Sequence, residues 1–201
     1  MGLLTRLSLP PIALSIIGIL IIDLLSYTYH LAAHKVNWLW RIHAVHHSEQ
    51  SLDATTSLRF HPIDFLLGSL WKMVGATILG IPLWVIALYQ ILIIPLSIFQ
   101  HANIHVPAWV ERIFGWLLIT PAIHKHHHSI VRREHDSNYG VGLVIWDRLF
   151  ATLQQPEHPT PKQTGVKGLE TEASQTIFGM LLTPLRYKPL KETAITNSDS
   201  V

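Results

Sequence analysis

"IDFLLGSLWKMVGATILGIPLWVIALYQILIIPLSIF", residues 63–99, is the stretch of this sequence that decides the fold. It is almost continuously apolar, and as one α-helix it would be about 55 Å long. About 20 residues suffice to cross a bilayer, so the stretch is too long for one crossing and suits two. The segment Gly80-Ile81-Pro82 is the natural break, which predicts a helical hairpin. Lys72 inside it is expected to snorkel or to face protein.

Other apolar stretches flank this hairpin. Residues 9–29 are apolar apart from Asp23 and a few hydroxyl groups, which predicts a first membrane helix rather than a signal peptide. Residues 107–123 are bounded by prolines and contain Trp109 and Trp116, which predicts an interfacial helix. From Gln154 onward the composition is polar, and a loose tail with one short apolar turn at "TIFGMLL" is expected.

The bulk composition indicates a membrane protein. Hydrophobic residues make up 49% of the 201 residues and charged residues only 14%, against about 25% charged in soluble domains. The chain contains no cysteine, which excludes disulfides, thiolate nucleophiles and cysteine-ligated metals. The net charge of +2 is mild, and no basic block is interleaved with aromatic residues, so nucleic acid is not an expected partner.

Histidines are concentrated in four short groups near the ends of the apolar stretches. The strings "HLAAH", "HAVHH", "HANIH" and "HKHHH" contain eleven of the 14 histidines, and ten of these, all except His126, form the four groups. Spacings of three and four residues place side chains on one helix face, so each group can direct two or three imidazoles to one point. His126 lies about 200° around the helix from His124 and is expected to point away. The candidate metal ligands are His30, His34, His43, His46, His47, His101, His105, His124, His127 and His128.

A shared metal site explains all four groups together. A single histidine pair is more often a surface or core feature, but four groups with helix-face spacing beside apolar helices are hard to explain as independent accidents. Burying ten unpaired imidazoles would be costly, whereas imidazole is a good ligand for iron, zinc and copper. Ten ligands exceed what one octahedral ion accepts, so two ions with about five ligands each are the simplest arrangement.

These motifs resemble the fatty acid hydroxylase / sterol desaturase superfamily. The resemblance is carried by "DLLSYTYHLAAH", "WRIHAVHHS", "LRFHPID", "HANIH" and "HKHHHSIVRREHDSNYGVGLVIWDRLFAT", in the family's order. It divides the chain into residues 1–19, the N-terminal part of the first membrane helix, residues 20–153, the family-like domain, and residues 154–201, a polar tail. His105 is the least secure ligand, and Ala151 replaces the glycine of the family's usual "LFGT" ending.

The resemblance implies an all-α integral membrane protein with about three transmembrane helices and a cytoplasmic helical cap carrying a dimetal site. Members of the superfamily are non-haem di-iron enzymes that use O2 and two electrons to hydroxylate or desaturate lipid C–H bonds. The ten histidines would then bind two irons, and zinc is expected to replace iron in some purified samples. The expected partners are a lipid in the bilayer and a separate ferredoxin- or cytochrome-type electron donor. A partner subunit or a homodimer would complete the membrane part of so short a chain.

Polar residues near the histidines are expected to orient the ligands, because metal-bound histidines usually donate their second N–H to a carboxylate or carbonyl. Asp23 lies two turns before His30 on the same helix face, with Tyr27 one turn before it; the alternative is a plain polar cluster. Asn138 could instead only enable the "SNYG" turn. His61, before a proline, is expected to have a structural or gating role. The supporting residues are Asp23, Tyr27, Asp136, Asn138 and Asp147.

The distribution of positive charge predicts the orientation. If all the histidine groups share one site, the two crossings of the hairpin return the chain to the same face of the membrane. The loops on that face carry Lys35, Arg41, Arg59, Arg112, Lys125, Arg132, Arg133 and Arg148, whereas the hairpin tip is uncharged. The positive-inside rule then places the histidines in the cytoplasm and the N-terminus outside, although Arg6 argues weakly against this.

Two classes of function fit these features. The first is a membrane di-iron oxygenase that acts on a lipid, and the alternative is a non-catalytic membrane metal-binding protein or metal transporter. Transporters usually place polar ligands in the middle of the membrane, whereas most of these histidines lie just beyond the helix ends. Sterols, fatty acyl chains, sphingoid bases, ether lipids and carotenoids remain open as substrates. Hydroxylation and desaturation share the first hydrogen abstraction, so the ligands do not separate them.

Overall fold

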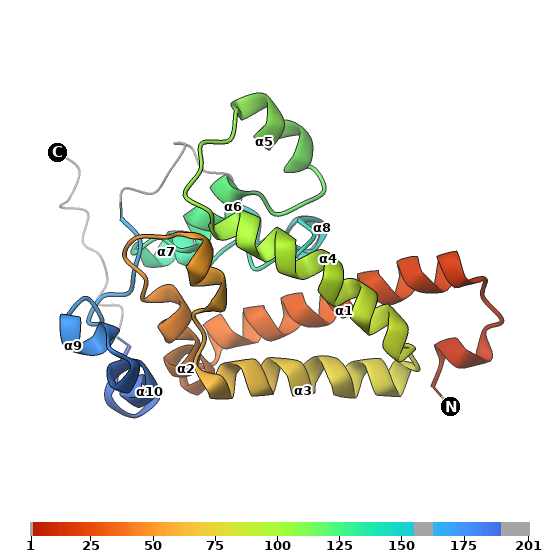
Figure 1. The fold of residues 1–201 in the computed structure, drawn as a ribbon, viewed down its shortest axis with the longest axis horizontal. Coiled ribbons are helices and arrows are strands. Elements are labelled where there is room, and N and C mark those ends of the chain that lie inside the picture. Colours follow the sequence, from red (N-terminus) through yellow and green to blue (C-terminus); the bar gives the residue numbers. More distant parts are fainter. Residues whose placement is uncertain (1, 155–162, 190–201) are drawn as a thin grey trace.

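Three long apolar helices form the body of the molecule (Figure 1). The computed structural model describes residues 2–154 and 163–189, which form helices and loops with two isolated β-bridges. Among them α1 (Pro11–Lys35), α3 (Pro62–Leu79) and α4 (Leu83–His101) are long and apolar enough to cross a membrane. At 1.5 Å per residue these helices are about 27 to 38 Å long. The predictions of an all-α membrane protein and of three spanning helices are confirmed.

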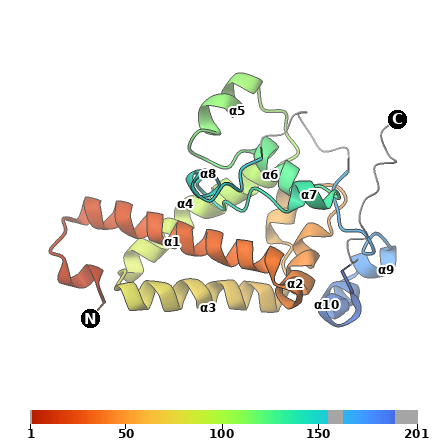
Figure 2. The same cartoon turned by 180° about the vertical axis from the view of Figure 1, so that it is seen from behind.

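The remaining described helices are short and mostly lie beyond the ends of the spanning helices (Figure 2). They are η1 (Leu4–Arg6), α2 (Asn37–His47), η2 (Ala54–Leu58), α5 (Ala108–Phe114), α6 (Pro121–His127), α7 (Arg132–His135), α8 (Ile145–Leu149), α9 (Glu172–Gln175) and α10 (Ile177–Arg186). At the end opposite the hairpin tip, α2, α6 and α7 gather against α1 and α4 and form a helical cap (Figure 1).

The hairpin break lies where the sequence predicts it. Gly80 adopts a left-handed conformation with φ 74°, which glycine reaches without steric penalty. The N–H groups of Gly80 and Ile81 donate to the carbonyls of Thr77 and Ala76 and close the end of α3. Pro82 then caps the start of α4. From this tip α3 and α4 diverge, and each packs along α1 (Figures 1 and 2).

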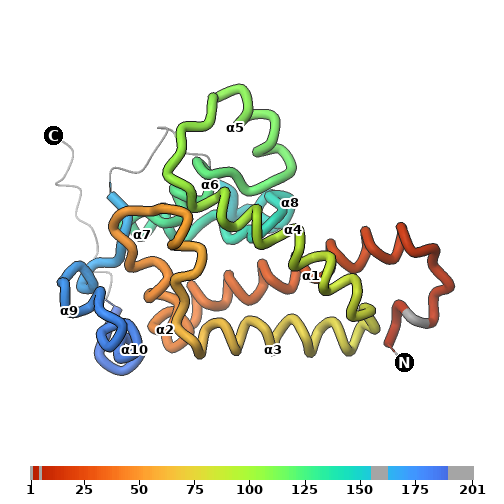
Figure 3. The backbone as a smooth tube through the Cα atoms, viewed as in Figure 1, coloured from red at the N-terminus to blue at the C-terminus, as the bar shows by residue number. Residues whose placement is uncertain are grey.

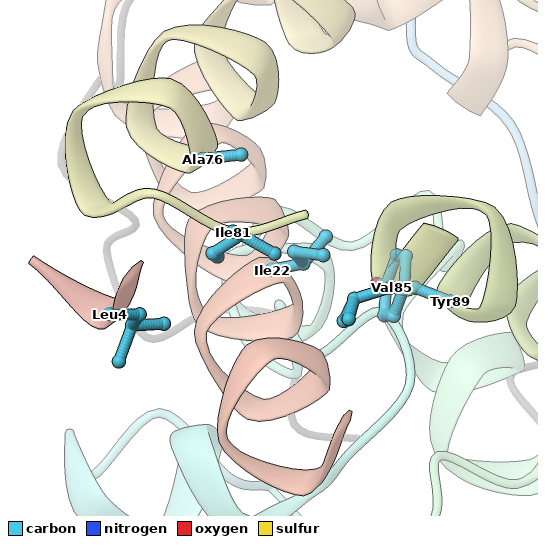
Figure 4. Packing of buried hydrophobic residues seen from close by; sticks show 6 residues of the cluster. All are labelled: Leu4, Ile22, Ala76, Ile81, Val85 and Tyr89. Atoms are coloured by element: carbon cyan, nitrogen blue, oxygen red, sulfur yellow. The ribbon is translucent and has the colours of Figure 1, made fainter. Parts of the chain in front are cut away.

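A small apolar core holds the three spanning helices together near the hairpin tip. Its buried members are Leu4, Ile22, Ala76, Ile81, Val85 and Tyr89 (Figure 4). Farther from the tip, glycines on α3 allow this helix to approach α1 closely. A Cβ at Gly75 would lie 2.6 Å from Leu25 Cδ1, and one at Gly68 would lie 3.0 Å from Tyr29 Cε1. Small residues at such contacts are typical of helix packing in membranes.

The prediction of one interfacial helix over residues 107–123 is wrong about the length of the helix. The helix α5 covers only the first part of this stretch and ends at Phe114 before Gly115. The next segment, residues 118–119, pairs with residues 142–143. The Ile119 N–H donates to the Gly142 carbonyl, and Leu118 forms an isolated β-bridge with Leu143. Pro121 starts α6. A contact between segments distant in sequence therefore interrupts the apolar stretch.

The described part of the C-terminal segment, residues 163–189, is not a loose tail. In the described part, α9 and α10 follow one another, and α10 packs against α2, as the path of the backbone shows (Figure 3). The apolar turn expected at "TIFGMLL" is a helix of 10 residues. Residues 155–162 and 190–201, which the predicted tail includes, lie outside the described residues.

Candidate metal centre

Nine of the ten candidate ligands gather in two neighbouring buried groups. The five-histidine group contains His30, His34, His43, His47 and His127, and the four-histidine group contains His46, His101, His124 and His128. In each group one ring nitrogen per histidine lies within 4.8 Å of those of the others. The groups draw on α1, α2, α4 and α6 and on His128, which caps α6. The cap therefore brings together imidazoles from four separate sequence motifs.

His105 does not join either group. The helix that carries His101 ends at that residue, and Ala102 is extended with ψ 134°. The helical spacing that would align His105 with His101 is therefore lost, and His105 lies exposed in the following loop. His126, expected to point away, lies outside both groups, and its Nε2 is 3.3 Å from Gln154 Oε1.

Hydrogen bonds to carbonyls fix the protonation of two rings in the five-histidine group. His30 Nδ1 donates to the Tyr139 carbonyl at 2.9 Å, and His127 Nδ1 donates to the Ser137 carbonyl at 2.6 Å. A neutral imidazole has only one N–H, so each Nε2 carries a lone pair. These two Nε2 atoms are 3.0 Å apart. Two lone pairs at this distance repel each other, and a metal cation bound by both nitrogens would remove this repulsion.

The four-histidine group repeats this arrangement. His101 Nδ1 donates to the Ser97 carbonyl at 2.7 Å, and His46 Nδ1 donates to the Arg59 carbonyl at 3.1 Å. Their Nε2 atoms therefore also carry lone pairs, and they lie 3.3 Å apart. His124 Nε2 lies 2.9 Å from His101 Nε2 and 3.2 Å from His128 Nε2. Four ring nitrogens thus converge on one small space.

Protonation is a poor way to satisfy these nitrogens. Burial lowers the pKa of His46, His47, His124, His127 and His128 well below 6.5, and the neighbouring histidines lower each of them further. All five are therefore neutral at pH 7.

Several buried ring nitrogens also lack a hydrogen-bond partner within the described part of the chain. They are both nitrogens of His34 and His47, Nε2 of His43, and Nδ1 of His124 and His128. Buried polar atoms are nearly always satisfied in folded proteins. Buried imidazoles with unsatisfied ring nitrogens are good ligands for a divalent transition metal, so each group could hold one ion.

Asp64 is the supporting residue that the sequence analysis missed. Its Oδ2 accepts a hydrogen bond of 2.8 Å from His43 Nδ1, and its Oδ1 accepts one of 2.6 Å from the Tyr29 hydroxyl. Asp64 lies in the first turn of α3, whose N-terminus faces the cap. The "HPID" motif shows an acidic residue at this position. However, no local sequence pattern indicates that its side chain contacts a histidine 21 residues earlier.

Asp23 does not bond to a ligand histidine, which corrects the expectation for it. Its carboxylate accepts hydrogen bonds of 2.8 to 3.1 Å from Tyr89, Trp146 and the backbone N–H groups of Gly142 and Leu143. Asp23 lies two turns from His30, at a level where the loop before α8 crosses α1. It therefore anchors this loop to the membrane helix and acts on the site only indirectly.

Asp147 supports His30 through the backbone. Burial raises the pKa of Asp147, against hydrogen bonds that lower it. Its two oxygens accept 2.7 Å hydrogen bonds from the N–H groups of Tyr139 and Gly140 and from the Thr152 hydroxyl. Because the Tyr139 carbonyl accepts from His30, Asp147 fixes the acceptor that orients this ring.

The other expected supporting residues have different roles. Asp136 Oδ1 is 3.7 Å from His34 Nδ1, so it faces a candidate ligand without a short hydrogen bond. Asn138 has φ 55° and bonds to backbone groups of Ile123 and Gln154, which agrees with the role in the turn. The Tyr27 hydroxyl is 2.9 Å from Thr152 Oγ1.

His61 has the structural role that was expected. Its Nδ1 accepts from the N–H of Ile63 and caps α3. Since that nitrogen carries the lone pair, Nε2 carries the proton, and it lies 3.3 Å from the Leu181 carbonyl in α10.

An apolar cavity of about 570 Å³ lies on the membrane side of the cap. Its walls come from α1, α4, α5 and residues 142–143, and they include Ile93, Leu96 and Phe99. Thr120 and Pro121, at the start of the helix that carries His124, also line it. The cavity has the size and character of a site for a small apolar ligand or part of a lipid.

Comparison with known proteins identifies the family. A family model for fatty acid hydroxylases matches residues 15–152. The chain belongs to the fatty acid hydroxylase family. The resemblance carried by the histidine motifs is thereby confirmed, and both histidine groups lie inside the matched region.

Individual proteins that the chain is similar to are hydroxylases or monooxygenases by name. The chain is 32% identical to ornithine lipid hydroxylase OlsE of Rhizobium tropici, over 88% of this chain and 52% of the relative. It is 32% identical to alkylglycerol monooxygenase of Xenopus tropicalis, over 66% of this chain and 28% of the relative. Identity to human cholesterol 25-hydroxylase is 26%, over 70% of this chain and 51% of the relative. The chain thus spans about half the length of such relatives or less. No solved structure matches it.

Proposed function

We propose that this protein is a membrane-bound oxygenase that hydroxylates a C–H bond of a membrane lipid with two iron ions. The observation that carries the proposal is the pair of buried histidine groups, in which facing Nε2 atoms carry lone pairs that a metal cation would satisfy. The five-histidine group would bind one iron and the four-histidine group the other. An all-histidine set of ligands is neutral, so it leaves the positive charge of the metals uncompensated and favours an electrophilic oxidant.

The relatives support hydroxylation over desaturation. Their names describe hydroxylases or monooxygenases acting on an ornithine lipid, on alkylglycerols and on cholesterol. The common feature is a C–H bond in a membrane lipid. One oxygen atom of O2 would enter that bond as a hydroxyl group. The other would be reduced to water with two electrons and two protons, the electrons coming from a separate ferredoxin- or cytochrome-type donor.

The residues of the chain would position the reactants. Bound iron would supply the O2 activation needed to attack an unactivated C–H bond. Carbonyls of Ser97, Tyr139 and Ser137 hold imidazole rings with their Nε2 atoms inward. The burial of both groups keeps water away from the site. The apolar cavity beside α4 would accept the hydrocarbon part of the lipid.

We place the histidine side in the cytoplasm. The loops at that end of the spanning helices carry Lys35, Arg59, Arg132 and Arg148 among other basic residues, whereas the hairpin tip carries none. A cytoplasmic site would be open to soluble electron donors. A homodimer is a further part of this proposal.

Lipid analysis combined with metal analysis tests the proposal. The wild type, His46→Ala and the matched variant His105→Ala are expressed in a host of known lipid composition. We expect a lipid that gains one oxygen atom with the wild type and with His105→Ala, and its loss with His46→Ala. Purified wild type and His105→Ala should each hold two irons, because His105 lies outside both groups.

Each other outcome points to a specific failure. Two irons with an unchanged lipid profile would favour the non-catalytic metal-binding alternative. Protein that takes up no iron on reconstitution would remove the basis of the proposed site. Protein that holds zinc tightly and stays inactive after reconstitution with iron would argue against iron chemistry.

A further inference from the structure

The helix α10 exposes a stripe of large apolar side chains. Ile177, Phe178, Leu181 and Leu185 are 71%, 78%, 43% and 76% exposed. Positions 177, 181 and 185 follow the i, i+4, i+8 spacing of one helix face, and Phe178 is one turn from Leu181. On the opposite side, α10 packs against α2 and buries Thr183. One face is therefore held by protein, and the other has no partner within the described part of the chain.

The position of α10 indicates what covers this stripe. His61, which caps the start of α3, lies within hydrogen-bond distance of the Leu181 carbonyl at 3.3 Å. This contact places α10 beside the point where α3 enters the membrane. Figures 1 and 2 both look nearly along the axis of α10, whereas α1 and α3 run across the view. The helix thus lies across the direction of the spanning helices, as a helix on the membrane surface would.

The surroundings of the stripe fit a lipid boundary. The first turns of α3, which start beside α10, expose Ile63, Phe65 and Leu66. At the C-terminal end of α10, Arg186 and Lys188 are exposed. An apolar stripe with basic residues at its end is typical of helices in the interface of membranes with anionic lipids.

We propose that α10 is an interfacial helix that inserts Ile177, Phe178, Leu181 and Leu185 into the leaflet on the histidine side. Arg186 and Lys188 bind anionic lipid headgroups there. Through His61 and α2, the helix ties the cap to the membrane surface. The inference depends on the three spanning helices and not on the proposed reaction.

The absence of cysteine from the sequence makes a direct test simple. Single-cysteine variants Phe178→Cys, Leu70→Cys and Glu172→Cys are labelled with an environment-sensitive NBD fluorophore and placed in nanodiscs of phosphatidylcholine and phosphatidylglycerol. Leu70, half-exposed in the middle of α3, is the reference for lipid, and Glu172, exposed on α9, is the reference for water. All three positions are at the surface, so folding should be preserved.

We expect the Phe178→Cys label to resemble the Leu70→Cys label, with blue-shifted emission, quenching by doxyl-labelled lipid and little quenching by iodide. The Glu172→Cys label should show the opposite pattern. A Phe178→Cys label quenched mainly by iodide would overturn the proposal. So would a label quenched by neither agent, since another part of this chain, or a second copy, would then cover the stripe.

The headgroup contact has its own test. In the Phe178→Cys background, the added substitutions Arg186→Ser and Lys188→Ser should weaken quenching by doxyl-labelled lipid in discs containing phosphatidylglycerol. They should have less effect in discs of phosphatidylcholine alone. Equal effects in both lipids would overturn the assignment of anionic headgroups.

Discussion

At the scale of single residues, Asp64 supplies a carboxylate that directly contacts a candidate ligand at short distance. Its bonds to His43 and Tyr29 are 2.8 and 2.6 Å long, and a charged acceptor makes them stronger than neutral ones. Asp64→Asn keeps the shape but removes the charge. We expect metal affinity at the five-histidine group to fall about 10- to 100-fold with the fold retained. Competition with a chelator of known affinity measures the change.

Asp53→Asn is the matched control for this substitution. Asp53 is exposed and caps η2, and asparagine caps a helix as well as aspartate does. Metal affinity should therefore remain at the wild-type level. A similar loss in both variants would show that the effect of Asp64→Asn is not specific to its contact with His43.

Acid should destabilise the metal-free protein through the buried histidines outside the spanning helices. Burial lowers the folded-state pKa of His46, His47, His124, His127 and His128 below the ordinary 6.5. As the pH falls below about 6.5, the unfolded chain binds protons that the folded chain does not. The free energy of unfolding then decreases by about 1.4 kcal/mol per pH unit for each histidine that stays neutral.

Thermal unfolding of metal-free protein in detergent checks this sign. The melting temperature should be lower at about pH 5.5 than at about pH 7.5, because stability rises with pH wherever the unfolded state binds more protons. Saturating metal should raise the melting temperature at the higher pH. A melting temperature independent of pH over this range would contradict the neutral, buried state of the rings.

Helical spacing predicts which histidines share a face only as long as the helix continues. It works for His30 and His34, which lie together on α1, and for the three histidines of α2. It fails for His105, because α4 ends at His101. Helical spacing could not predict the role of Asp64, because its contact with His43 depends on how α3 packs beside α1 and α2. That these residues bind metal remains a prediction.

At the scale of elements, a large side chain at Gly75 should disturb the contact between α1 and α3. A Cβ there would lie 2.6 Å from Leu25 Cδ1, so Gly75→Leu overpacks the interface. We expect destabilisation of about 1 to 3 kcal/mol, seen as a lower melting temperature in detergent. Val74→Leu is the matched control, since Val74 is 56% exposed on the outer face and should change little. Equal melting temperatures for the two variants would contradict this packing.

Local signals predict an element when the element depends on its own residues. Gly80 and Pro82 determine the end of α3 and the start of α4, and the hairpin follows from them. The stretch over residues 107–123 has the composition of one interfacial helix, but Ile119 bonds to Gly142 instead of continuing a helix. Similarly, α10 is stabilised by packing on α2, which no pattern within residues 177–186 reveals.

At the scale of the whole molecule, the orientation in the membrane decides which of the proposed electron donors could reach the cap. In the proposed topology the hairpin tip is outside and the histidine side is cytoplasmic. The cysteine-free sequence allows this to be tested with Leu83→Cys, 73% exposed at the tip, and Asn103→Cys, exposed beside the cap. A membrane-impermeant maleimide added to intact cells should label Leu83→Cys and leave Asn103→Cys unlabelled.

Lysis should make Asn103→Cys reactive, which shows that its protection comes from the membrane and not from burial in the protein. Labelling of Asn103→Cys but not Leu83→Cys in intact cells would reverse the topology. The basic loops would then lie outside, against the positive-inside rule, and a soluble cytoplasmic ferredoxin could not approach the histidine groups. The labelling pattern therefore tests the membrane orientation and the proposed class of electron donor together.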